Sequence, residues 1–219
     1  MPLKTFYNLK DSRKEEIRQV CYKEFALNDF NNASLSNIIK KLGLAKGSFY
    51  RYFKNKIDLY SYLLDYATTI RMQMVKNLAE KQGSDFFEIL IKNFSDKINF
   101  DLDYPLESAF TYRVLLETSN SEIIPIVNKL KQTIFLYTQE LLQNFQKQGQ
   151  IKQNVDVEMT AFLIYQAQVS LYEYLSIYKE NDFVKNIKTG TPLFSIKKDE
   201  IMEVVNKITN FIKHGISVS

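Results

Sequence analysis

The stretch SLSNIIKKLGLAKGSFYRYFKNKIDL, at residues 34–59, decides the fold. Ser34 can cap a short helix with its hydroxyl, and Gly43 can end that helix. The apolar residues between them follow the spacing of one helical face: Leu35, Ile38, Ile39 and Leu42. A second short helix follows, in which Phe49 and Phe53 lie four residues apart and face the core. Two short helices joined by a glycine-containing turn are typical of a helix-turn-helix.

The rest of the chain is predicted to be helical as well. Six glycines and four prolines among 219 residues provide too few turns for a β-sandwich or barrel. Ser12 and Glu15 have the spacing of a capping box at the start of a first helix. The predicted fold class is therefore all-α, with an N-terminal three-helix domain that holds the helix-turn-helix and a helical C-terminal domain. We expect the domains to cover residues 1–56 and 57–219.

Helical spacing also divides the C-terminal part. Long apolar stripes predict helices at 57–78, 157–178 and 199–213, with others opening near Pro105 and Ser121. Asp156 is predicted to cap the helix at 157–178, which is apolar on two faces and so should be buried on two sides. The remaining segments 101–104 and 181–195 are predicted to be a loop and a breaker-rich linker.

The rare residue types exclude several kinds of chemistry. Cys21 is the only cysteine and His214 the only histidine, so there can be no internal disulfide, no cysteine zinc cluster and no catalysis that needs a histidine in a triad. The sequence also lacks a glycine-rich phosphate loop and a GxSxG motif. We predict a protein that is not an enzyme, with no cofactor and no metal site. Without a signal peptide or a membrane-length apolar segment, it is predicted to be cytoplasmic.

The charge is divided unevenly along the chain. Residues 1–56 hold 12 Lys and Arg against 5 Asp and Glu, whereas residues 57–219 hold 17 against 20. A basic N-terminal quarter on a slightly acidic remainder favours contact with nucleic acid, although solubility alone also places lysines on surfaces.

Residues 34–59 resemble the DNA-binding module of the TetR family of bacterial transcriptional repressors. The matching positions are Ser34, Ile38, Gly43, Lys46-Gly47-Ser48-Phe49-Tyr50, Phe53 and the run from Lys56 to Leu59. With the first helix included, the resemblance covers residues 12 to about 62. Two positions depart from the family pattern: Asp29 stands where a glycine is usual, and Ala45 where a serine is common.

The resemblance implies a site for duplex DNA. The second helix of the motif would enter the major groove, where Lys46, Gly47 and Ser48 lie at its N-terminal end and Arg51 follows one turn later. The resemblance assigns phosphate contacts to five further residues: Ser34, Ser36, Tyr50, Tyr52 and Lys56. Tyr50 can alternatively be a packing residue.

The resemblance also implies that residues 57–219 bind an effector and dimerise. We expect a homodimer through helices near 157–178 and 199–213, a palindromic operator, and release by a small hydrophobic or aromatic molecule. Candidate pocket residues are Phe94, Phe110, Arg113, Tyr137 and Tyr165, although aromatic residues at helical spacing also suit a plain core. The alternative function is a helical protein that binds lipids or hydrophobic small molecules and uses its basic end on anionic surfaces.

Overall fold

The computed structural model describes residues 2–76, 85–118 and 120–218. These residues form helices α1 to α11, and their only β-type pairing is a single bridge between Ile151 and Ser217. The predicted all-α fold class is confirmed. No helix within the described ranges combines the length and the hydrophobicity needed to cross a bilayer.

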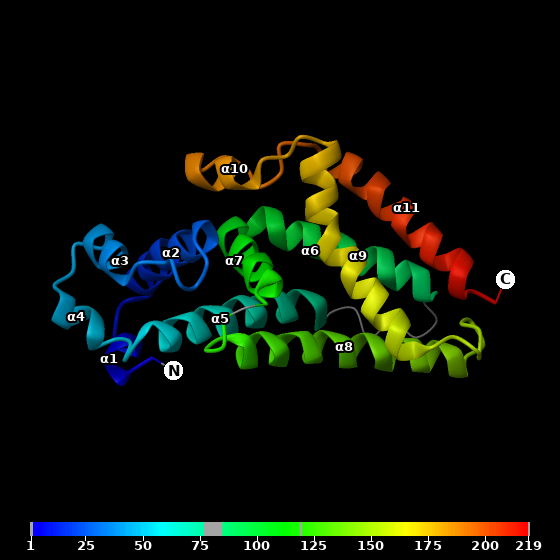
Figure 1. The fold of residues 1–219 in the computed structure, drawn as a ribbon, viewed down its shortest axis with the longest axis horizontal. Coiled ribbons are helices and arrows are strands. Elements are labelled where there is room, and N and C mark those ends of the chain that lie inside the picture. The colour runs from blue at the N-terminus through cyan, green and yellow to red at the C-terminus, as the bar shows by residue number, and fades with distance from the viewer. Residues whose placement is uncertain (1, 77–84, 119, 219) are drawn as a thin grey trace.

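The N-terminal helices form one end of the molecule, which we call the head (Figure 1). The head contains α1 (Lys4–Tyr7), α2 (Asp11–Leu27), α3 (Leu35–Lys41) and α4 (Lys46–Tyr50). The long helix α5 (Lys56–Lys76) begins at the head and runs away from it. Ser34 caps α3 as predicted, because its Oγ accepts a hydrogen bond of 3.2 Å from the Asn37 amide.

The remaining helices form the body, together with α5. They are α6 (Phe86–Asp103), α7 (Pro105–Leu116), α8 (Ile124–Lys147), α9 (Val157–Tyr178), α10 (Phe183–Thr189) and α11 (Lys198–Ile216). Helix α7 lies between α2 of the head and α6 of the body, α9 packs on α8, and α11 packs on α6 (Figure 1). Asp156 caps α9 as predicted, with its Oδ1 3.0 Å from the Met159 amide nitrogen.

The core of the head continues into the body through α7. Phe110 of α7 is fully buried, with its ring centroid 5.5 Å from that of Tyr22 and 4.9 Å from that of Tyr60. Val114 of α7 and Val127 of α8 belong to the same cluster of buried residues. The predicted domain boundary at residue 56 stays a prediction, and the apolar core crosses it.

The structure corrects four local predictions. The capping box is wrong: α2 already begins at Asp11, so Ser12 lies in its first turn. The loop at 101–104 is wrong because α6 continues to Asp103 and only Tyr104 separates it from α7. The linker at 181–195 contains the short helix α10, and α8 begins at Ile124, after a turn, instead of near Ser121.

Candidate nucleic-acid interface and regulatory cavity

The inner face of the helix-turn-helix is apolar and packs into the core of the head. Ile38 of α3, Phe49 of α4 and Phe53 are completely buried. Gly43 has a φ of 62°, a left-handed conformation that favours glycine and lets the chain turn from α3 to α4. Because the apolar side chains point inward, the polar residues of α3 and α4 are left on the outer surface at the end of the molecule (Figure 1).

The nine residues assigned to DNA contact fall into two groups. Five are exposed: Ser36, Lys46, Gly47, Tyr50 and Arg51. Four are half-buried: Ser34, Ser48, Tyr52 and Lys56. The side chains or backbone of the exposed group can be reached from solvent.

Lys56 is engaged within the protein. Its Nζ donates a hydrogen bond of 3.2 Å to the Asn31 carbonyl and lies 4.9 Å from the centroid of the Phe30 ring. Partial burial lowers the pKa of its ammonium group. Lys56 therefore joins the start of α5 to the turn between α2 and α3, and a phosphate contact would compete with these interactions.

Helix α1, which was not predicted from the sequence, lies beside the polar surface of α4. Phe6 is fully buried, with its ring centroid 5.0 Å from that of Phe53. The Leu3 amide donates a 2.8 Å hydrogen bond to the Tyr52 carbonyl, and Thr5 Oγ1 donates to the Arg51 carbonyl. An open cleft of about 290 Å³ results, lined by Thr5, Asn8, Leu9, Ser48, Arg51 and Tyr52. In the sequence, α1 is indicated only by the apolar residues Phe6 and Leu9, which lie three positions apart.

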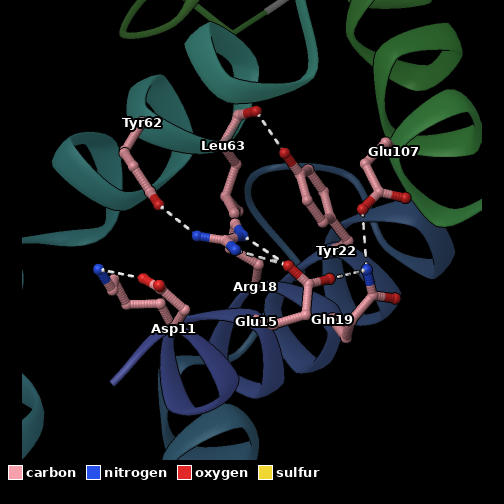
Figure 2. A network of polar contacts seen from close by, with 9 residues as sticks. Asp11, Glu15, Arg18, Gln19, Tyr22, Tyr62, Leu63 and Glu107 are labelled. Carbon is pink, nitrogen blue, oxygen red and sulfur yellow. Dashed lines mark hydrogen bonds and ion pairs between the residues drawn. The ribbon is translucent and has the colours of Figure 1, made fainter. Parts of the chain in front are cut away.

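A polar network joins α2 to the body (Figure 2). Arg18 donates to Glu15 Oε2 at 2.6 Å and to the Tyr62 hydroxyl of α5 at 3.1 Å. Gln19 Nε2 donates to Glu15 at 2.7 Å and to Glu107 Oε1 of α7 at 2.8 Å. Movement of α5 or α7 is thereby coupled to α2, against which the helix-turn-helix packs.

Glu107 is an unusual member of this network because it is buried. Burial raises the pKa of its carboxyl group, and the neighbouring Glu15 adds to the rise, while the hydrogen bond from Gln19 and the charge of Arg18 oppose it. The junction between α7 and α2 thus holds a carboxylate whose charge is only partly compensated.

The five predicted pocket residues do not gather in one place. Phe94 and Phe110 belong to two separate clusters of buried residues. Arg113 donates through Nε to the Ala26 carbonyl at 3.0 Å, so it joins α7 to α2. Tyr137 is 40% exposed on α8, and Tyr165 packs its ring 5.0 Å from that of Phe135. Their assignment to an effector pocket is not supported by this arrangement.

A different cavity lies among α5, α6, α7 and α9. Its lining residues are Arg71, Lys97, Phe100, Asp101, Ser108, Thr111, Tyr112, Leu115, Val169 and Tyr172. Its volume of about 20 Å³ is enough for a single water molecule. The cavity is therefore small, and a larger occupant would have to move its walls.

Four of the lining residues form a closed ring of hydrogen bonds. Lys97 Nζ donates to Asp101 Oδ2 at 2.9 Å and also to the Tyr172 hydroxyl. Ser108 uses its hydrogen on Asp101 Oδ1, so the 3.1 Å contact between Ser108 Oγ and the Tyr172 hydroxyl must be donated by Tyr172. Burial lowers the pKa of Lys97 to about 8 although Asp101 opposes the change.

This ring was not predicted from the sequence, because Asp101 was expected in a loop and lies in α6. A signal was present: Lys97 and Asp101 continue the apolar stripe of Leu90 and Phe94 at helical spacing. Charged residues four apart on a stripe that is otherwise apolar indicate a buried ion pair.

The head also matches a known family by its sequence. The profile described as "Bacterial regulatory proteins, tetR family" matches residues 17–63, which include α3 and α4. The HTH-type transcriptional regulator SAB2452 of Staphylococcus aureus is 24% identical over 178 residues, which are 75% of this chain and 91% of that protein. Residues 17–63 therefore match the DNA-binding domain of the TetR family, and the chain is a transcriptional regulator with a DNA-binding helix-turn-helix.

Solved structures of transcriptional regulators have the same fold. A TetR family transcriptional regulator from Chloroflexus aurantiacus superposes with a TM-score of 0.81 at 22% identity, and the match covers 100% of both chains. The regulator FadR from Bacillus subtilis, solved in complex with stearoyl-CoA, gives a TM-score of 0.70 at 18% identity over 92% of this chain and 98% of that one.

Proposed function

We propose that this transcriptional regulator is a TetR family repressor that binds a pseudo-palindromic operator as a dimer and leaves it when a small organic effector binds. The observation that carries the proposal is the position of α7. Glu107 of α7 bonds to Gln19 of the head, and the next residue, Ser108, bonds to Asp101 and Tyr172 at the cavity. One helical turn therefore touches both the DNA-binding head and the wall of the cavity.

This contact explains how an effector would act on DNA. A molecule that enlarges the cavity must displace Ser108 or its partners, and α7 then moves against α2. A small rotation of two heads changes the distance between their recognition helices, which the operator fixes near 34 Å or a multiple of it. FadR of Bacillus subtilis, which shares the fold and binds stearoyl-CoA, supports effector binding by this architecture.

We propose that the dimer forms through α8 and α9. An apolar stripe runs along the outside of α9 with the spacing of one helical face and includes Met159, Leu163, Tyr174 and Ile177. Leu163 is 56% exposed and Ile177 is 62% exposed, and Leu136 of α8 is similarly open. Exposed apolar side chains that gather on one helical face are typical of a protein interface.

Helix α11 is less suited to the interface than the sequence suggested. It packs on α6 and buries the apolar face formed by Ile201, Val204 and Val205 within one protomer. The proposed interface therefore keeps the predicted helix at 157–178 and replaces the one at 199–213 by α8.

Selection of bound sequences from a random duplex pool tests this function. We expect two inverted half-sites, protection of both in a footprint, and binding that weakens steeply with salt. A monomer that protects one half-site would contradict the dimer. Equal retention on anionic lipid vesicles would favour the lipid-binding alternative over operator recognition.

A further inference from the structure

The walls of the cavity between α5, α6, α7 and α9 carry an excess of positive charge. Arg71 and Lys97 are cations, and Asp101 is the only carboxylate among the lining residues. Both oxygens of Asp101 are already occupied, one by Lys97 and one by Ser108. One positive charge at the cavity is therefore left without a counter-charge from the walls.

Two cationic groups at the cavity also have hydrogen-bond donors left over. An ammonium group has three protons, and Lys97 uses two of them on Asp101 and Tyr172. Among the described residues, the Arg71 guanidinium has no hydrogen bond or ion pair, yet it is close enough to Lys97 to influence its ionisation. Charged donors that lack an acceptor favour an anionic one.

The other walls are apolar or aromatic. Phe100, Leu115 and Val169 line the cavity, and the rings of Tyr112 and Tyr172 stack at a centroid distance of 4.3 Å. A flat or short aliphatic group suits such walls, and it would have to separate the stacked rings because the cavity holds only about 20 Å³.

We propose that the effector is an organic monocarboxylate with an aromatic or short aliphatic body, and that Arg71 and the free proton of Lys97 bind its carboxylate. One negative charge balances the one unmatched positive charge of the walls. The inference rests on the proposed function and specifies the effector class for the same cavity.

Calorimetry on the full-length protein tests the class of effector with matched pairs of probes. Benzoate, naphthoate and octanoate are each compared with the corresponding alcohol: benzyl alcohol, naphthalenemethanol and octanol. We expect at least one carboxylate to bind at least about tenfold more tightly than its alcohol, as a charge-assisted contact requires. Equal affinities within every pair, or no binding by any carboxylate, would overturn the proposal.

Two variants assign the binding to this cavity. Arg71→Met removes the unmatched charge without breaking the hydrogen-bond ring, and we expect it to weaken carboxylate binding about tenfold or more. Lys92→Met is the control, because Lys92 lies on the exposed side of α6, the helix that carries Lys97, and pairs there with Asp96 four residues later. Unchanged affinity in Arg71→Met, or an equal loss in Lys92→Met, would contradict the site.

Operator binding separates this inference from the proposed function. A carboxylate that binds through Arg71 but does not release the operator would leave the site intact and contradict effector-controlled repression. A neutral molecule that releases the operator while no carboxylate binds would uphold repression and contradict the anionic class.

Discussion

Lys46 and Lys56 show how the structure separates two lysines that the sequence placed together in one DNA-binding set. Lys46 is exposed at the start of α4, whereas Lys56 is held by Asn31 and the Phe30 ring. The first is free to reach a base edge. The second already has interactions that a phosphate would have to replace.

We predict that Lys46→Ala reduces affinity for the selected operator by about 1–3 kcal/mol and relaxes the preference at one base pair. Affinities for the operator and for its single-base variants measure this effect. Lys129→Ala, on an exposed position of α8, is the control and should change nothing. An equal loss on every sequence would instead make Lys46 a backbone contact.

Lys97 gives a second prediction at this scale, through pH. Its pKa is about 8 in the folded protein and about 10.4 in an unfolded chain, so the unfolded state binds more protons between these values. The free energy of unfolding of the wild type, relative to Lys97→Met, should therefore rise as the pH increases from 8 to 10. Denaturant unfolding of both proteins measures this difference and cancels the tyrosine titrations that they share.

If the difference in free energy of unfolding between the wild type and Lys97→Met stays constant from pH 8 to 10, Lys97 is not desolvated as the structure indicates. Lys97→Met leaves Asp101 without its cation, so the double variant Lys97→Met with Asp101→Leu is the check if the single variant fails to fold. The double variant should show no pH-dependent contribution from this pair.

At the scale of elements, α7 is part of the core of the head as well as of the body. Phe110 is fully buried against Tyr22 of α2 and Tyr60 of α5. We predict that Phe110→Ala lowers the free energy of unfolding by about 3–5 kcal/mol and increases amide exchange in α2. Phe211→Ala is the control, because Phe211 is 84% exposed on α11 and its loss should cost little. Unaltered exchange in α2 would mean that α7 does not support the head.

The sequence predicted these elements unevenly. Periodicity and capping residues gave α3 and α9, because their apolar spacing and the caps Ser34 and Asp156 act locally. The short helices α1 and α10 were not predicted, because helices of so few residues are stabilised by packing instead of by local sequence. In α1, for example, Phe6 is buried against the head.

The two candidate sites also differ in how far they could be predicted from the sequence. The DNA-binding residues follow a sequence motif whose positions are fixed by two adjacent helices, so most of them could be placed on the surface in advance. The cavity is assembled from α5, α6, α7 and α9, and its ring joins residues 75 positions apart in the sequence, Lys97 and Tyr172. Such a site depends on the packing of distant helices, which helical periodicity does not specify.

At the scale of the whole molecule, two features indicate a second copy of the chain. One is the exposed apolar stripe on α9. The other is the single helix-turn-helix at one end of the protomer (Figure 1). A single head offers one recognition helix and reads only a few base pairs, whereas specific binding by this motif uses two half-sites related by a two-fold axis. Pairing of two stripes across such an axis would bury apolar side chains and give the assembly two heads.

We therefore predict that Leu163→Asp produces a monomer, because it puts a charge within the stripe, where two copies would exclude water. Light scattering measures the mass of this variant in solution. The variant should also bind the operator at least about a hundredfold more weakly than the wild type, since each head would then bind its half-site alone. Val184→Asp adds the same charge to an exposed position of α10 and should remain a dimer with full affinity. If Leu163→Asp stays dimeric while a charge at Phe211 of α11 dissociates it, the interface lies on α11. In that case the predicted helix at 199–213 would regain its role in the interface.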